Sequence, residues 1–241
     1  MLSKNQSKLI TSLQQKKYRV QYQLFVVEGI KVVNELLSSN YELNKLFCTE
    51  DCSALFKNCN LQIISEKELS KISNLSSPNK VLGLFKIPTT YKIKEEGLIL
   101  VLDGINDPGN LGTIIRLSDW FGVSHIVCSK NTVDCYNQKV VQATMGSLAR
   151  ISITYEDLEV FLKETQLPIY GAVMDGTNVY SRSLQQNAVL VMGNESNGMS
   201  KTIESLINTK VTIPKYSEST VTESLNVATA TAILLNEFRR K

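Results

Sequence analysis

The residues best suited to chemistry lie in three polar loops, and each loop follows a short apolar run. The runs and their loops are 98–102 with 103–112, 188–192 with 193–198, and 211–214 with 222–227. An apolar run followed by a loop rich in Gly, Pro, Asn and Asp, and then by a helical pattern, predicts a strand, a loop and a helix. Ligands of open α/β sheets bind beyond the carboxyl ends of the strands. The three loops can therefore converge into one site.

Arg116 is a candidate for a direct contact to a ligand. It lies in the first turns of the helix predicted after the first loop, where its planar set of donors can reach an oxygen of a ligand. An ion pair with Asp119, three residues further on, is the structural alternative. The one histidine, His125, falls inside a predicted strand, where a lone histidine is usually structural. We therefore do not expect a histidine to act as a general base.

Four other polar residues at the loops allow both a structural and a functional interpretation. Asn110 can cap the helix that follows the first loop, and Ser224 and Asn226 can cap the last helix. Glu195 can be a helix-start charge before residues 200–207. The same side chains can instead line a site, and the pattern alone leaves both interpretations open.

Strand–helix alternation predicts how these loops are positioned. Strands are expected at 98–102, 125–128, 169–173, 188–192 and 211–213, and helices at 112–121, 137–145, 156–165, 200–207 and 225–239. Nearly all-apolar strands that alternate with helices are typical of a parallel sheet covered on both faces. The fold class is therefore α/β.

A second, smaller α/β domain is expected over residues 1–86. Its predicted helices are 4–16, 30–37 and 66–75, and its predicted strands are 25–29, 45–48, 61–64 and 81–85. Residues 87–97 have an early proline, polar residues and a closing glycine, which is the composition of a linker to the domain at 98–241.

Taken together, the three loops resemble the motifs of the SpoU-type, TrmH-like RNA ribose 2′-O-methyltransferases of the SPOUT class. The residues that match are Asn110 and Arg116 in the first motif, Gly193, Asn194 and Glu195 in the second, and Ile213, Pro214, Ser224, Leu225 and Asn226 in the third. Each motif alone is weak, but all three occur in the family's order.

The resemblance implies the roles of these residues. Catalytic roles are implied for Asn110, Arg116, Glu195, Ser224 and Asn226, and contacts to the cofactor, S-adenosyl-L-methionine, for Met192, Gly193, Asn194, Ile213 and Leu225. The methyl group passes to a ribose hydroxyl by in-line displacement. A guanidinium has a pKa above about 12, so Arg116 is better suited to stabilising the developing alkoxide than to removing a proton. The proton acceptor stays open.

The resemblance also implies features of the whole molecule. The third motif is expected to thread a deep trefoil knot, which periodicity cannot reveal. Catalytic domains of the family pair as homodimers. The Phe25–Gly29 segment resembles the opening of the substrate-binding domain in rRNA-directed members. In two places the chain departs from the family: residues 215–221 replace a stretch that usually holds a glycine, and Ser196 stands where glycine is frequent.

The amino-terminal end is basic, and this is compatible with RNA binding. The first 27 residues contain no acid and five basic residues, which are Lys4, Lys8, Lys16, Lys17 and Arg19. Such residues supply phosphate contacts, although a solvated terminus would have the same composition.

The composition argues against a disordered, membrane-spanning or secreted protein. Charged residues make up 20% of the chain and hydrophobic residues 43%, so a folded core is expected. No apolar run is long enough for a membrane span, and no secretory signal is visible. Cys48, Cys52 and Cys59 have no histidine near them, so reduced thiols without a metal are expected. We therefore expect a cytoplasmic protein.

The predicted function is S-adenosylmethionine-dependent methylation of a ribose 2′-hydroxyl in RNA. The amino-terminal domain favours rRNA, as does the end of the chain just after the last helix, and tRNA is the alternative. A non-catalytic RNA-binding or ribosome-assembly factor on the same fold is a second alternative. A dinucleotide-dependent oxidoreductase is disfavoured because Gly104, Gly109 and Gly112 do not have the Rossmann spacing.

Overall fold

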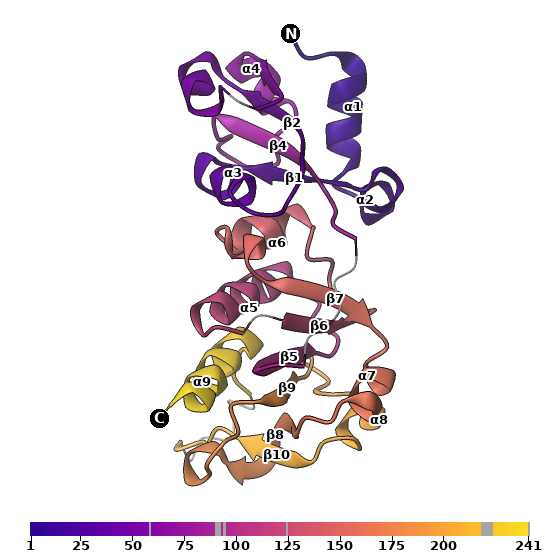
Figure 1. Cartoon of the computed structure of the whole chain (residues 1–241), viewed down its shortest axis with the longest axis vertical. Coiled ribbons are helices and arrows are strands. Elements are labelled where there is room, and N and C mark those ends of the chain that lie inside the picture. The colour runs from indigo at the N-terminus through magenta and orange to yellow at the C-terminus, as the bar shows by residue number, and fades with distance from the viewer. Residues whose placement is uncertain (58, 90–92, 94, 124, 218–223, 241) are drawn as a thin grey trace. The chain divides into compact units, whose positions relative to one another are not determined.

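The chain forms two units, each built on its own β-sheet (Figure 1). A computed structural model describes residues 1–57, 59–89, 93, 95–123, 125–217 and 224–240. The first unit comprises residues 1–89 and 134–149, and the second comprises 90–133 and 150–241. Part of the predicted linker, at 90–92 and 94, lies outside the described residues. No described helix has the length and apolar character needed to cross a membrane.

The first unit has a four-stranded sheet in the order β1-β4-β2-β3, in which only β2 and β3 run parallel. The strands are β1 (Leu24–Glu28), β2 (Leu43–Cys48), β3 (Leu61–Ile63) and β4 (Val81–Lys86). The helices are α1 (Lys4–Ser12), α2 (Lys16–Tyr22), α3 (Ile30–Leu37), α4 (Glu66–Ser70), α6 (Gln138–Ala143) and the 3₁₀ segments η1 (Glu50–Phe56) and η2 (Ser147–Ala149). The predicted helix at 4–16 corresponds to α1 and ends at Ser12, and the sequence does not predict α2.

Residues 134–149 are grouped with the first unit, whereas the sequence predicts an uninterrupted domain over 98–241. The Tyr136 ring lies 4.7 Å from the Phe25 ring, centroid to centroid. Gly146 lies so close to Glu35 that an added Cβ would be 2.7 Å from its Cγ. These contacts join segments more than a hundred residues apart, which local patterns cannot reveal.

The second unit has a six-stranded, fully parallel sheet in the order β10-β8-β9-β5-β6-β7. The strands are β5 (Leu98–Leu102), β6 (His125–Ser129), β7 (Ser152–Glu156), β8 (Ile169–Asn178), β9 (Ala188–Met192) and β10 (Thr209–Thr212). The sequence correctly predicts β5 and β9, which are buried along their whole length. It does not predict β7, an edge strand that is only partly buried and mixes polar with apolar residues.

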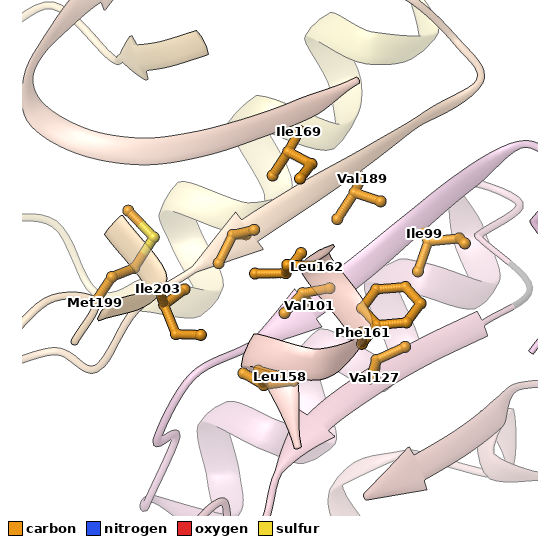
Figure 2. Close-up of a cluster of buried hydrophobic side chains, with 11 residues drawn as sticks. Ile99, Val101, Val127, Leu158, Phe161, Leu162, Ile169, Val189, Met199 and Ile203 are labelled. Atoms are coloured by element: carbon orange, nitrogen blue, oxygen red, sulfur yellow. The ribbon is translucent and has the colours of Figure 1, made fainter. Parts of the chain in front are cut away.

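Helices cover both faces of the second sheet, as the apolar strands predict (Figure 1). One face carries α5 (Pro108–Trp120) and α9 (Val227–Arg239), which pack on each other. The other face carries α7 (Leu158–Glu164) and α8 (Lys201–Glu204). Figure 2 shows Phe161 and Leu162 of α7 packed over Val101 of β5 in the buried cluster. The 3₁₀ segment η3 (Val179–Ser181) follows β8.

This topology places the three polar loops at one edge of the sheet. The loops after β5 and β9 leave neighbouring parallel strands, and the loop after β10 leaves a strand two positions from β9 and three from β5. The predicted trefoil knot depends on the path of the chain through residues 218–223. These lie outside the described residues, and the knot stays a prediction.

Candidate active site

Three side chains, one from each polar loop, form a continuous chain of hydrogen bonds. Asn226 Nδ2 donates to Asn110 Oδ1 at 2.9 Å, and Asn110 Nδ2 donates to Glu195 Oε1 at 2.5 Å. The residues are separated by up to 116 positions in the sequence. The predicted convergence of the loops therefore occurs in the structure.

The capping role of Asn226 determines which of its side-chain atoms faces Asn110. Asn226 is the N-cap of α9, and its Oδ1 accepts from the backbone N–H groups of Ala228 at 3.0 Å and Thr229 at 3.2 Å. Because the oxygen is occupied, the Asn226 amide nitrogen must point toward Asn110. Asn110 then accepts with its oxygen and donates with its nitrogen to the Glu195 carboxylate.

Asn110 itself is not a helix cap, although the sequence allows that interpretation. Asp107 caps α5 by accepting from the Asn110 backbone N–H at 2.8 Å, and Pro108 occupies the first helical position. The Asn110 side chain is left for the hydrogen bonds to Asn226 and Glu195. Asn226 therefore caps a helix and also bonds to Asn110, whereas Asn110 does not cap α5.

The second loop is a tight turn built around Asn194. Its Oδ1 accepts from the backbone N–H groups of Ser196 at 2.9 Å and Asn197 at 3.1 Å, and its Nδ2 donates to the Gly104 carbonyl at 2.8 Å. A Cβ on Gly193 would lie 2.4 Å from the carbonyl carbon of Gly198. Glycine is therefore required at 193 by the turn itself, whatever a ligand requires.

Arg116 is exposed on α5, and it forms no hydrogen bond or ion pair with the described part of the chain. The predicted alternative, a pair with Asp119, is not formed. Asp119 instead pairs with Arg150 at 2.8 Å. The Arg116 guanidinium is thus available to an incoming ligand.

His125 lies at the start of β6 and is buried, as expected for a structural histidine. Its Nε2 lies 3.2 Å from Thr154 Oγ1 on the neighbouring strand β7. Burial lowers the pKa of His125, so the neutral ring is favoured. The ring is held inside the sheet rather than in the loops.

A cavity of about 730 Å³ lies beside the second and third loops. Seven residues that the sequence assigns to the site line it: Met192, Gly193, Asn194, Glu195, Ile213, Ser224 and Leu225. Glu195 connects this cavity to the chain of hydrogen bonds through Asn110. The cavity and the hydrogen-bonded residues Asn226, Asn110 and Glu195 therefore form one continuous site.

Two residues of this region are not singled out by the sequence. Asp103 accepts from the Ser200 backbone N–H at 2.8 Å and so ties the first loop to the start of α8. Asp175 lines the cavity from β8, which runs five residues past its predicted end. Asp103 directly follows a buried strand, a usable signal, but the polar end of β8 has no apolar pattern to reveal it.

Family comparisons identify the chain. The model of the SpoU rRNA methylase family matches residues 97–236, and that of the MRM3-like substrate-binding domain matches residues 4–83. The chain belongs to the SpoU methylase family. The predicted enzyme class, an RNA methyltransferase, is thereby confirmed, as is the α/β architecture with an amino-terminal substrate-binding domain.

Relatives of the SpoU family match nearly the whole chain. The Bacillus subtilis 23S rRNA (guanosine(2553)-2′-O)-methyltransferase RlmP is 28% identical over 94% of this chain and 93% of its own. A Porphyromonas gingivalis structure assigned to the TrmH family of RNA methyltransferases has a TM-score of 0.91 at 38% identity, covering 99% and 98% of the two chains. An AdoMet-bound rRNA methyltransferase from Sinorhizobium meliloti has a TM-score of 0.88 at 29% identity, covering 99% and 95%.

The cavity of this SpoU-family chain fits S-adenosylmethionine in size and charge. Small-molecule sites typically measure about 300–1,000 Å³, which brackets the cavity. Its wall contains the carboxylates of Asp175, Glu195 and Glu204 and the ammonium group of Lys215. Glu204 pairs with Lys210, so Asp175 and Glu195 are the carboxylates that suit the positive sulfonium and ammonium groups of the ligand. Met192, Ile213 and Leu225 supply apolar surface for the rest of the molecule.

The five basic residues at the amino-terminal end differ in their exposure to solvent. Lys4, Lys8, Lys16 and Lys17 are exposed. Arg19 is 2% exposed. It pairs with Asp134 at 2.6 Å and donates from Nη1 to the carbonyls of Leu13 at 2.8 Å and Gln14 at 2.9 Å. The prediction that Arg19 contacts RNA is wrong, because its guanidinium is already occupied inside the first unit.

Proposed function

We propose that this chain transfers the methyl group of S-adenosylmethionine to a ribose 2′-hydroxyl of ribosomal RNA. The observation that carries the proposal is the hydrogen-bonded chain Asn226–Asn110–Glu195, which joins all three motifs at the wall of the cavity. The relatives named above as rRNA methyltransferases support rRNA as the substrate. The match to a substrate-binding domain at residues 4–83 supports a separate RNA contact.

The residues divide the work of the reaction between them. When bound, S-adenosylmethionine would supply an electrophilic methyl group to the ribose oxygen, in line with the carbon–sulfur bond that breaks; S-adenosylhomocysteine would leave and the hydroxyl proton would be released. Arg116, always cationic and without a partner in the described chain, stabilises the hydroxyl oxygen as that oxygen gains negative charge. Asn110, fixed on both sides by hydrogen bonds, orients the nucleotide beside Glu195.

A methylation assay with defined RNA tests this function. The full chain is incubated with labelled S-adenosylmethionine and with either ribosomal RNA or tRNA that lacks ribose methylation, and the modified nucleotide is mapped. Incorporation into a ribose of rRNA is expected. Incorporation into tRNA alone would replace the substrate class, and incorporation into a base would contradict the reaction.

We also propose that two copies of the protein form a homodimer through the second unit. Trp120 supports it, because the indole is 82% exposed and lies one helical turn after Arg116 on α5. Exposed large aromatic side chains are typical of surfaces that pack against a protein. Light scattering of the full chain should give about twice 26.9 kDa, and a single 26.9 kDa species would contradict the dimer.

A further inference from the structure

The cavity has one aromatic side chain among its described lining residues, and it is the side chain of Tyr216. Tyr216 is 84% exposed. It makes no hydrogen bond and no ring contact within the described chain. It lies in the segment where the sequence departs from the usual glycine-containing form of the third motif. No described residue stacks on the ring, so the described chain leaves the ring open to a ligand.

Two other large apolar side chains at the same cavity are also exposed. Met174 is 65% exposed and Leu225 is 46% exposed, and both line the cavity. Apolar surface beside a concave site gains free energy when a flat apolar group covers it. Tyr216, Met174 and Leu225 thus offer apolar surface to the ligand, and the carboxylates of Asp175 and Glu195 offer negative charge in the same wall.

We propose that the Tyr216 ring stacks on the adenine of the methyl donor. This rests on the proposed function, in which S-adenosylmethionine occupies the cavity. Adenine is the one aromatic group of that ligand, and its sulfonium and ammonium groups favour the carboxylates instead. Aromatic side chains stack on nucleobases without needing a particular hydrogen-bond pattern. A base of the RNA substrate on Tyr216 is the competing outcome.

Calorimetry with the full chain tests the stacking. The ligands are S-adenosylhomocysteine and 5′-methylthioadenosine, which share the adenosine but differ in the amino-acid part. Tyr216→Ala should weaken both ligands by about five- to tenfold, since stacking on a base is worth on the order of 1–3 kcal/mol and this site is exposed. Tyr216→Phe should bind within about twofold of the wild type, because the ring is retained.

Tyr180→Ala is the matched control. Tyr180 is a 40% exposed tyrosine of the same unit that does not line the cavity, so both affinities should be unchanged. Thermal melting of each variant verifies that the fold is intact.

Three results would overturn the stacking. Wild-type affinity of Tyr216→Ala for both ligands would remove Tyr216 from the site while leaving the proposed function in place. The same result together with a loss of RNA affinity in filter binding would assign the ring to an RNA base. Failure of the wild-type chain to bind either ligand would overturn the proposed function and the stacking together.

Discussion

Arg116 differs from the other polar residues of the site because its charge has no partner among the described residues. Arg116→Ala should therefore leave folding and donor affinity nearly unchanged. It should lower the single-turnover rate of methyl transfer by about 10²–10³-fold, the usual effect of losing one donor to the developing negative charge. Calorimetry and rapid-quench kinetics on the native RNA measure the two effects. Near-normal turnover would remove Arg116 from the mechanism.

His125 makes stability depend on pH. Burial places its folded-state pKa below the ordinary value of 6.5, so the unfolded chain takes up a proton more readily than the folded chain. The contribution of the neutral ring is present above about pH 6.5 and is lost as the pH falls below it. The melting temperature of the wild type should therefore fall more than that of His125→Asn between pH 7.5 and 5.5. Equal slopes would contradict this.

At the scale of elements, a buried ion pair fastens residues 134–149 to the first unit. The side chains of Arg19 and Asp134 are 3% and 12% exposed. Removing one partner of such a pair leaves a buried charge without compensation, which typically costs about 3–5 kcal/mol. Asp134→Asn should lower the free energy of unfolding in urea by about that amount. Glu159→Gln, which breaks an exposed pair with Lys163, should change it by less than about 1 kcal/mol.

Sequence patterns predict some strands and site residues of this protein and miss others. Buried central strands such as β5 and β9 are predicted to the residue, because both faces are apolar. The polar half of β8 and the edge strand β7 are not, because pairing with neighbours, rather than composition, makes them strands. For the site, the motifs identify Asn110 and Glu195, but only the structure reveals that Asp107 caps α5 and leaves Asn110 to bond to Glu195.

At the scale of the whole molecule, four exposed lysines of the first unit are expected to carry RNA affinity that depends on salt. Replacing Lys4, Lys8, Lys16 and Lys17 with glutamine should weaken binding to all RNA sequences. It should also reduce the slope of log affinity against log salt by about 0.7–0.9 for each phosphate that is no longer neutralised. Filter binding at several salt concentrations measures the slope.

The control for this experiment is Lys163→Gln, an exposed lysine of the second unit that pairs with Glu159. Its slope should equal that of the wild type. An unchanged slope in the fourfold variant would mean that the basic end is only a solvated surface, which is the alternative that its composition allows.

The hydrogen bonds of Asn226 make two backbone amides of α9 report on the site. The Ala228 and Thr229 N–H groups bond to Asn226 Oδ1, while the nitrogen of the same amide bonds to Asn110. Deuterium uptake at these two positions should therefore be slow while the three loops are joined. Uptake should accelerate in Asn110→Ala, although the substitution lies on another helix. Hydrogen-exchange mass spectrometry of the peptide at the start of α9 can thus follow assembly of the site without substrate or label.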